Sequence, residues 1–282
     1  MTRTLAVLLT LAAVSAASAV SAQVRVISDL DYVAGAEYPD KKDRLDVYVP
    51  PGAANAPVIL SLHGGALRAG DKSQQTFVGQ RFAAAGMVTA VVNYRLSPSV
   101  THPAHIEDVA AAVAWVKRNI AKYGGDPGKL FVIGHSAGAY LAALLVLDPK
   151  YLARHGLTSK DLRGVVPVSG FFYVDRTGVA PDRPKDVWGT DVSVWKSASP
   201  ATHVSRDVPP MLVLYADGDD AWRREQQADF AKALDRAGHG DHDVRMIRGR
   251  THGSVWSEMA KGDEDTSRAI LQFVHRLSAG TQ

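Results

Sequence analysis

Short apolar runs alternate with longer segments of helical periodicity along most of the chain. The first four runs carry no charged residue and have the length of strands covered on both faces. They occupy residues 58–62, 88–92, 130–133 and 165–168. Two later runs, at 211–215 and 244–247, continue the series. Each run predicts one strand of a common sheet.

One stretch near the start follows a different pattern. Residues 44–49 alternate polar and apolar side chains, and Pro50, Pro51 and Gly52 end the stretch. A period of two is expected for a half-exposed strand. We therefore expect this strand to lie at the edge of the sheet.

Helical periodicity is clearest between residues 103 and 123, where apolar residues recur every three or four positions. This apolar face is formed by Ile106, Val109, Ala110, Val113, Val116 and Ile120. Further helices are predicted at 139–147, 222–237 and 264–277. Because strands and helices alternate, the predicted fold class is α/β, with a mostly parallel central sheet and helices on both faces.

Residues 169–210 interrupt this alternation. They have little periodicity and carry five bulky aromatic residues, Phe171, Phe172, Tyr173, Trp188 and Trp195. A long irregular segment inside a compact domain is more often functional than accidental, so we expect a partial cover over the site. The aromatic side chains fit an apolar or aromatic substrate and packing in the core equally well.

The first 22 residues have the pattern of a secretory signal peptide, with a cation at Arg3, an apolar run at 5–14 and small residues up to Ala22. We expect cleavage after Ala22, with Ala19 as the second choice, and a periplasmic or secreted protein. Residues 23–282 would then form one domain without a membrane span.

Composition narrows the chemistry. The chain has no cysteine, which excludes a thiol nucleophile and disulfides. Its 32 basic and 29 acidic residues nearly balance, and no basic run is interleaved with aromatic residues, so nucleic-acid binding has no support. No cofactor is expected. The loop at 239–242 holds two histidines and an aspartate, but a plain turn explains it better than a metal site.

The sequence GHSAG at 134–138 joins a predicted strand to a predicted helix. This context is that of a nucleophile elbow, in which a strained turn exposes a serine hydroxyl above the sheet. Glycine is expected at 134 and 138 because a Cβ there would collide with a neighbouring strand or helix. Ser136 is therefore the candidate nucleophile.

A serine nucleophile needs a base, a carboxylate that orients the base, and donors for the oxyanion. His252 follows the last predicted strand and is the candidate base, whereas His135 lies inside the elbow and is expected to pack against the sheet. Asp217, Asp219 and Asp220 follow the preceding strand, and we prefer Asp219 among them. The order serine, aspartate, histidine is the one expected on a hydrolase sheet.

The loop HGGA at 63–66 directly follows a predicted strand. Small residues there let backbone N–H groups face a substrate. The amides of Gly65 and Ala66, together with that of Ala137 after the nucleophile, would form an oxyanion hole. His63 is expected to hold the loop by hydrogen bonds.

With these residues assembled, residues 40 to 278 or so resemble the α/β-hydrolase serine esterases of the hormone-sensitive-lipase and feruloyl-esterase-like group, which includes kynurenine formamidases. The resemblance rests on HGGALRAGDK at 63–72, NYRL at 93–96, GHSAG at 134–138, Ser-Pro at 199–200 and Asp219. It implies an α/β-hydrolase fold, a triad of Ser136, Asp219 and His252, and an oxyanion hole at Gly65, Ala66 and Ala137.

Two positions depart from the pattern of that group. Ala66 and Leu67 replace the usual Gly-Trp or Tyr-Trp, which should remove a bulky wall beside the acyl pocket. Tyr215 and Ala216 replace His-Gly before the acid.

The leading hypothesis is an exported serine carboxylesterase that hydrolyses a small-molecule ester. Hydrolysis of an amide or N-formyl group, as in kynurenine formamidase, would use the same residues, but export argues against it. A hydrolase fold without activity, used for binding, predicts the loss of a triad residue, and all three are present. A structural protein predicts repeats, and we find none. The sequence carries no indication of an oligomeric state.

Overall fold

The described chain builds one sheet of eight strands in the order β1-β2-β4-β3-β5-β6-β7-β8. The computed structural model describes residues 23–33, 35, 38–176, 182–262 and 264–279, and the expected signal peptide, residues 1–22, lies outside them. The strands are β1 (Arg25–Asp31), β2 (Arg44–Val49), β3 (Ala56–Leu62), β4 (Val88–Val92), β5 (Gly125–His135), β6 (Gly164–Val168), β7 (Met211–Gly218) and β8 (His242–Thr251).

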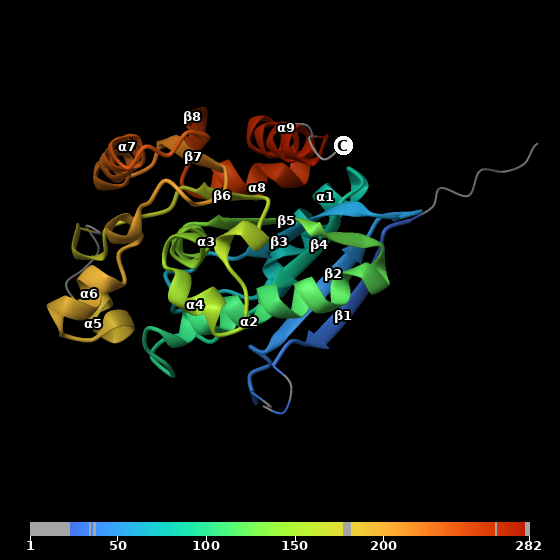
Figure 1. The fold of residues 1–282 in the computed structure, drawn as a ribbon, viewed down its shortest axis with the longest axis horizontal. Helices are drawn as coiled ribbons and strands as arrows, with labels where there is room; N and C mark the ends of the chain where they lie inside the picture. The colour runs from blue at the N-terminus through green and yellow to red at the C-terminus, as the bar shows by residue number, and fades with distance from the viewer. Residues whose placement is uncertain (1–22, 34, 36–37, 177–181, 263, 280–282) are drawn as a thin grey trace, which may run out of the picture.

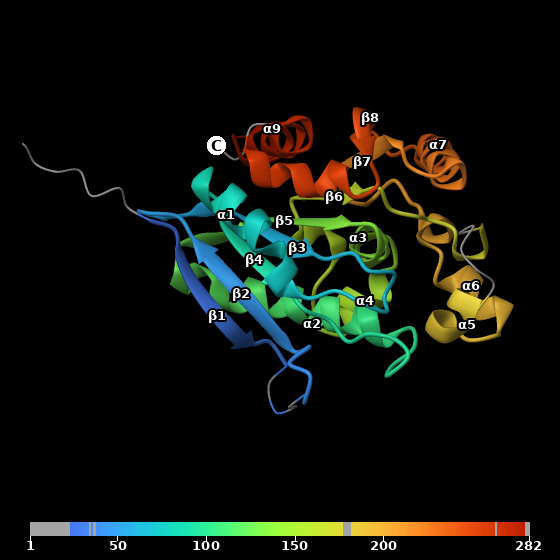
Figure 2. The ribbon, with the colours of Figure 1, turned by 180° about the vertical axis from the view of Figure 1, so that it is seen from behind.

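Strands β3 to β8 run parallel, and β2 pairs antiparallel with both β1 and β4. The helices are α1 (Thr76–Ala84), α2 (Ala104–Asn119), α3 (Ala137–Leu147), α4 (Pro149–Ala153), α5 (Asp182–Trp188), α6 (Val192–Ser197), α7 (Ala221–Arg236), α8 (Ser254–Ser257) and α9 (Asp265–Ala279). In Figures 1 and 2, α2, α3 and α4 cover one face of the sheet, and α1, α8 and α9 cover the other. The expected mostly parallel α/β sheet with helices on both faces is confirmed.

Alternate side chains of the parallel strands enter two separate cores. Leu60 of β3 and Val132 of β5 pack in the core that includes α2 and α3. Their neighbours Ile59 and Phe131 pack in the core that includes α1, α8 and α9. Because both faces of these strands are buried, their sequences are continuous apolar runs rather than alternating ones.

The expectation that residues 44–49 form a half-exposed edge strand is wrong. Strand β1, which the sequence pattern does not predict, pairs with β2 and takes the edge position. Every residue of β2 after Arg44 is buried. Asp46 does not face water, because its carboxylate lies 2.7 Å from Nζ of Lys72. The alternation of polar and apolar residues here reflects a buried ion pair.

The segment between β6 and β7 is more regular than expected, since it contains α5 and α6. Helix α5 is attached to two loops that precede α1 and α2. The backbone N–H of His102 donates to the carbonyl oxygen of Val187 at 2.6 Å, and Arg68 forms an ion pair with Asp186 at 3.1 Å. These contacts fix α5 over the end of the sheet where the loops gather.

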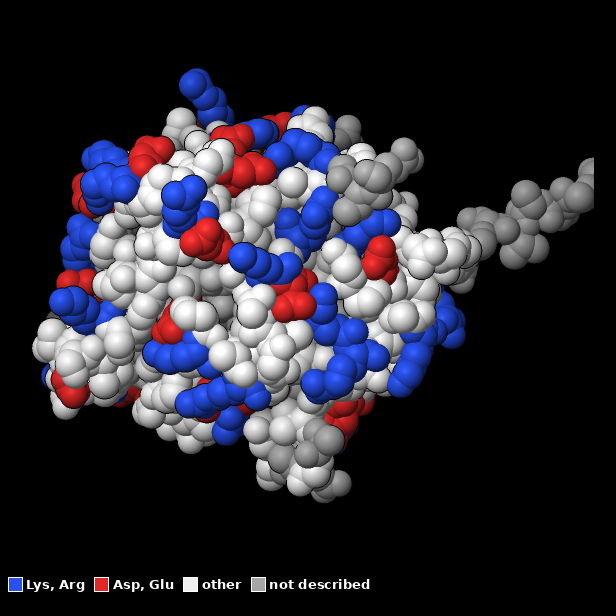
Figure 3. Space-filling model, in the orientation of Figure 1, with Lys and Arg blue, Asp and Glu red and all other residues white. Residues whose placement is uncertain are grey.

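The surface is mixed in charge. On the face seen in Figure 3, basic and acidic side chains are interspersed. Among the described residues, opposite charges also form exposed ion pairs, such as Arg276 with Asp241 at 3.0 Å. None of the described helices combines the length and apolar character needed to cross a bilayer.

Four histidines are held neutral by their surroundings. Burial lowers the pKa of His63, His102 and His105 to about 4, and that of His135 to about 3. In the unfolded chain, histidine titrates near its ordinary pKa of about 6.5. Between these values the unfolded state binds more protons than the folded state, so acidification favours unfolding.

We predict that the free energy of unfolding falls as the pH drops from about 7 to about 4.5, by up to about 1.4 kcal/mol per pH unit for each of these histidines. Urea unfolding followed by circular dichroism at each pH would measure the slope. His102→Gln, which removes one of the four titrating groups, should make the slope shallower. A stability that stays constant or rises on acidification would contradict this account.

Candidate active site

Ser136 lies on the tight turn between β5 and α3. Its φ of 54° and ψ of −112° are outside the regions that non-glycine residues favour. A Cβ on Gly134 would lie 2.3 Å from the carbonyl oxygen of Gly138, and a Cβ on Gly138 would lie 2.3 Å from that of Leu62. The turn therefore requires glycine at both positions, as the sequence predicts.

His252 and Asp219 form a hydrogen-bonded chain with Ser136. Nε2 of His252 lies 3.0 Å from Oγ of Ser136, and Nδ1 lies 2.6 Å from Oδ1 of Asp219. The three side chains come from the carboxyl ends of β5, β7 and β8, which meet at one edge of the sheet. Because Asp219 accepts a hydrogen bond from the N–H at Nδ1, Nε2 is left free to accept the hydroxyl proton of Ser136.

Asp219 is a buried carboxylate with several donors. It is 2 % exposed, and its Oδ2 accepts hydrogen bonds from Ser169 Oγ at 2.6 Å and from the N–H of Ala216 at 2.9 Å. Burial alone would raise the pKa of this carboxyl, but the hydrogen bonds from His252 and Ser169 outweigh it and hold the pKa below its ordinary value. Asp219 is therefore ionised at neutral pH and can stabilise a protonated His252.

The two competing aspartates have other partners. The carboxylate of Asp217 accepts hydrogen bonds from the N–H groups of Gly249 and Arg250 at 2.9 and 3.0 Å, which joins the end of β7 to β8. Asp220 directly precedes α7. Of the three candidates, Asp219 is the one whose carboxylate contacts His252 in the described structure.

His135 contacts the backbone of His252 as well as the neighbouring sheet. Its Nε2 lies 2.7 Å from the carbonyl oxygen of His252, and its ring stacks on that of Trp256 with centroids 5.5 Å apart. Burial lowers the pKa of His135 to about 3, so the ring stays neutral and donates this hydrogen bond. His135 therefore positions the backbone that carries His252.

The loop after β3 has an unusual backbone. Gly65, Ala66 and Leu67 all have positive φ, at 113°, 56° and 61°. A Cβ on Gly65 would lie 2.0 Å from the carbonyl oxygen of Ala69, and the N–H of Ala69 donates to the carbonyl oxygen of Gly65 at 2.9 Å. Left-handed backbone in residues other than glycine is strained and needs support from its surroundings.

That support comes from the side chains of Lys42, Asp71, Asn93 and Tyr94. The carboxylate of Asp71 accepts hydrogen bonds from Lys42 Nζ and Asn93 Nδ2, both at 2.9 Å. Lys42 Nζ also donates to the carbonyl oxygen of Gly70 at 3.0 Å. The hydroxyl of Tyr94 donates to the carbonyl oxygen of His63 at 2.7 Å. Both ends of the loop are thus attached to the sheet.

A cavity of about 540 Å³ opens beside Ser136, a volume typical of small-molecule sites. It is lined by Gly65, Ala66, His135, Ser136, Phe171, Trp188, Asp220, Trp222, Arg223 and His252. Two of the three expected oxyanion donors, Gly65 and Ala66, therefore border the same space as Ser136. The third, Ala137, begins α3, so its N–H has no acceptor within the helix.

One wall of the cavity is aromatic. Phe171 stacks on Tyr140 with ring centroids 4.6 Å apart, and Trp188 meets Phe171 edge to face at 5.9 Å. Trp188 Nε1 donates to the hydroxyl of Tyr140 at 3.1 Å. Phe171 and Trp188 are 7 % and 5 % exposed, so these aromatic residues both pack in the core and face the cavity.

Leu67 does not lie beside the cavity, although the sequence comparison led us to expect that its small size would open space there. It is 1 % exposed and packs in the core, and it does not line the cavity, whereas Ala66 does. Of the two replaced positions, only Ala66 therefore has a direct effect on the space beside Ser136.

Sequence reasoning missed four residues of this site: Ser169, Asp220 as a lining residue, Trp222 and Arg223. Ser169 directly follows β6, at the same end of the sheet as Ser136, Asp219 and His252. A polar residue at the carboxyl end of a neighbouring strand was the signal that could have found it. Asp220, Trp222 and Arg223 come within four positions after Asp219 in the sequence, at the start of α7. Their closeness in sequence to a predicted triad residue was the signal that could have found them. In the part of the chain that the structure describes, no group of three or more histidine, aspartate or glutamate residues is arranged to hold a metal ion.

Residues 45–163 match the BD-FAE family model. Esterase LipQ of Mycobacterium tuberculosis is 32% identical over 227 residues, which cover 75% of this chain and 53% of LipQ. Esterase LipC of the same organism is 32% identical over 241 residues, which cover 79% of this chain and 59% of LipC. The chain thus spans between half and three-fifths of the length of these curated relatives.

Solved structures share the fold. A truncated carbohydrate esterase from gut microbiota superposes with a TM-score of 0.77 at 22% identity, covering 93% of this chain and 99% of that one. A hyperthermophilic esterase from the archaeon Pyrobaculum calidifontis has a TM-score of 0.73 at 25% identity, covering 90% of this chain and 85% of that one. The chain therefore has the α/β-hydrolase fold that its motifs imply.

We predict that a small fluorophosphonate labels one serine of the folded protein, because His252 accepts the hydroxyl proton of Ser136 as the oxygen–phosphorus bond forms and fluoride leaves. Intact-mass spectrometry should detect a single adduct, and peptide mapping should assign it to Ser136. Asp219→Asn should slow labelling by about 10³-fold or more, since the base would then hold the wrong tautomer.

Asp217→Asn is the matched control, and its labelling rate should equal that of the wild type. An adduct on another residue, or equal slowing in the two aspartate variants, would show that the hydrogen-bonded chain does not activate Ser136.

Proposed function

We propose that this chain, an α/β-hydrolase related in sequence to curated mycobacterial esterases, is a serine carboxylesterase acting on small to medium esters. The observation that supports this most strongly is the hydrogen-bonded chain from Ser136 through His252 to Asp219, with distances of 3.0 and 2.6 Å. Ser136, at the end of this series of hydrogen bonds, borders a cavity of about 540 Å³, which leaves room for a small ester beside the proposed nucleophile.

In the proposed first half-reaction, Oγ of Ser136 attacks the ester carbonyl carbon while Nε2 of His252 takes the hydroxyl proton. The carbonyl oxygen becomes an oxyanion, which the N–H groups of Gly65, Ala66 and Ala137 stabilise. The carbon–oxygen bond to the alcohol then breaks, His252 gives its proton to the leaving alcohol, and the acyl group remains on Ser136.

In the second half-reaction, His252 takes a proton from water as the water oxygen attacks the acyl carbon. The second tetrahedral species collapses, the carboxylic acid leaves, and the proton returns from His252 to Ser136. The ionised Asp219 stabilises the positive charge on His252 in both halves. No step requires a metal or a cofactor.

Cleavage of an N-formyl arylamine would use the same three residues, because attack on an amide carbonyl needs the same base and oxyanion donors. The leaving amine must be protonated by His252 before it departs. Ester and formamide hydrolysis therefore differ in substrate and not in machinery, and a direct comparison of the two substrates distinguishes them.

We also propose that the protein acts outside the cytoplasm, in the periplasm or the medium. The charge, apolar run and small residues within positions 1–22 support export, with cleavage after Ala22. N-terminal sequencing of the protein recovered from a non-cytoplasmic fraction should begin at Gln23.

We expect the purified protein to hydrolyse p-nitrophenyl acetate and butyrate, and Ser136→Ala to lower kcat by about 10³-fold or more, because the nucleophile is lost. Release of p-nitrophenolate measures both rates. Ser193→Ala, which changes an exposed serine on α6, is the control and should keep the wild-type kcat. If folded wild type cleaves an N-formyl arylamine but no ester, the esterase proposal is wrong; if it cleaves neither, hydrolysis itself is excluded for these substrates.

A second prediction concerns the oxyanion donors. Gly65→Ala should lower kcat by about 10²-fold or more with little change in KM, because the added Cβ displaces the loop from the position that the transition state requires. Steady-state kinetics on p-nitrophenyl acetate would measure both constants.

Gly52→Ala is the matched control for Gly65→Ala. Gly52 also has positive φ, at 68°, but a Cβ there meets no atom within 4 Å. Its kcat should remain at the wild-type value. Equal kcat in the Gly65→Ala variant would mean that this loop does not contribute to oxyanion stabilisation.

A further inference from the structure

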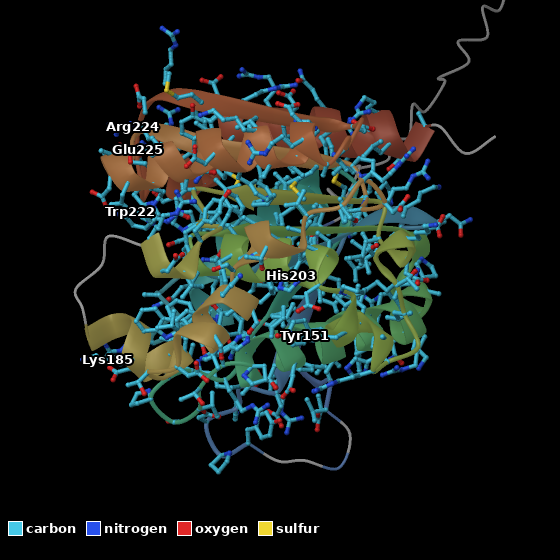
Figure 4. All side chains as sticks on the ribbon, turned by 60° about the vertical axis from the view of Figure 1, so that its left-hand side comes forward. Tyr151, Lys185, His203, Trp222, Arg224 and Glu225 are labelled. Carbon is cyan, nitrogen blue, oxygen red and sulfur yellow. The ribbon has the colours of Figure 1, made fainter. Side chains whose placement is uncertain are left out.

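Helix α7 carries three buried polar side chains, Arg223, Gln226 and Gln227, here named the α7 polar stripe. They are 8, 3 and 0 % exposed. Positions three and four apart share one face of a helix, so the stripe points into the protein together. Figure 4 labels neighbouring residues of α7, including the exposed Glu225, on the same side of the molecule as Lys185 of α5.

Gln226 uses the full hydrogen-bonding capacity of its amide on one segment of backbone. Its Oε1 accepts from the N–H groups of Phe172 and Tyr173 at 2.7 and 2.9 Å. Its Nε2 donates to the carbonyl oxygens of Tyr173 and Arg176 at 3.1 and 2.6 Å. A buried side chain with four such bonds fixes the path of the backbone it contacts.

The other two residues of the stripe bind the start of the same segment. Gln227 Nε2 donates to the carbonyl oxygen of Gly170 at 2.9 Å. Arg223 Nη1 donates to the carbonyl oxygens of Ser169 and Gly170 at 2.8 and 3.2 Å. The α7 polar stripe therefore contacts the backbone of residues 169–176 along most of its length.

This segment needs such partners because it follows β6 without continuing as strand or α-helix. Buried N–H and C=O groups outside regular structure must be paired by other means. The segment also carries Phe171, which forms the aromatic wall of the cavity beside Ser136. The position of that wall consequently depends on a helix whose polar residues are remote in sequence.

We propose that Gln226 is a positioning residue that sets substrate selectivity: by fixing the backbone next to Phe171, it limits the size of the ester group that packs against the aromatic wall. The inference rests on the proposed esterase function. Gln226 has no described contact with Ser136, His252 or Asp219, so its effect reaches the substrate through the wall. Arg223 is less suitable as a test, since it also lies 3.8 Å from Asp219.

The test compares Gln226→Leu with Glu225→Leu, a matched change at the neighbouring exposed position of α7. For each variant, kcat/KM is measured for p-nitrophenyl hexanoate against acetate, and for 2-naphthyl acetate against p-nitrophenyl acetate. These ratios are independent of the fraction of active enzyme. Gln226→Leu should change one ratio by about tenfold in favour of the larger group, mainly through KM. Glu225→Leu should leave both ratios unchanged.

Phe171→Leu shortens the wall without removing a hydrogen bond, and it should shift the same ratio in the same direction even if Gln226→Leu fails to fold. Lys117→Met serves as a stability control, because Lys117 Nζ also binds two distant carbonyl oxygens, those of Pro127 and Asp161, at 2.8 and 3.0 Å. Lys117→Met should lower stability and leave both ratios at the wild-type value.

Hydrogen–deuterium exchange of the peptide spanning 169–176 shows whether Gln226→Leu has loosened the segment. If exchange accelerates while both ratios stay within about twofold of the wild type, the selectivity role is overturned. An equal shift in Lys117→Met, or no shift in Phe171→Leu, would overturn it as well. A wild type that cleaves no ester would instead refute the proposed function, and this inference with it.

Discussion

The site depends on one buried charge, the carboxylate of Asp219. An ion removed from water costs several kcal/mol unless hydrogen bonds and opposite charge compensate it. Here the compensation comes from residues within or directly after three adjacent strands: Ser169 after β6, the N–H of Ala216 in β7 and His252 after β8. The same contacts that make the charge tolerable also orient the base toward Ser136. Because β6, β7 and β8 are neighbours in the sheet, their residues can surround Asp219, and this same arrangement orients His252.

The aromatic wall of the cavity, which includes Phe171, is held by some of the same residues. The hydroxyl of Ser169 donates a hydrogen bond to Asp219, and the carbonyl oxygen of Ser169 accepts one from Arg223 of α7. The backbone that continues from Ser169 carries Phe171 and is held by Gln226 and Gln227. The residue that donates to Asp219 and the surface that would contact the substrate are thus attached to the same helix. On the opposite side, the strained loop at Gly65 and Ala66 is held by Asp71, which binds Lys42 and Asn93.

Much of this architecture could be predicted because its signals are local. Apolar runs gave the parallel strands, and the GHSAG turn named Ser136 from the strand and helix on either side of it. Other features could not be predicted, because their cause lies in distant contacts. Strand β1 is mostly exposed and has no apolar run, and Asp46 resembled a solvent-facing residue because Lys72, its partner, lies 26 positions away. Likewise, Gln226 looks like an ordinary surface residue of a polar helix until its partners, which lie 50 to 54 positions earlier in the chain, are known.

The central claim is that Ser136 carries the acyl group between two half-reactions. The most direct measurement is rapid acid quenching of the enzyme during turnover of a p-nitrophenyl ester, followed by intact-mass spectrometry and peptide mapping. The account predicts an initial burst of p-nitrophenolate and a mass increase of one acyl group located on Ser136. Sustained turnover by an enzyme with no acyl adduct at any quench time, or with the adduct on a different residue, would contradict it.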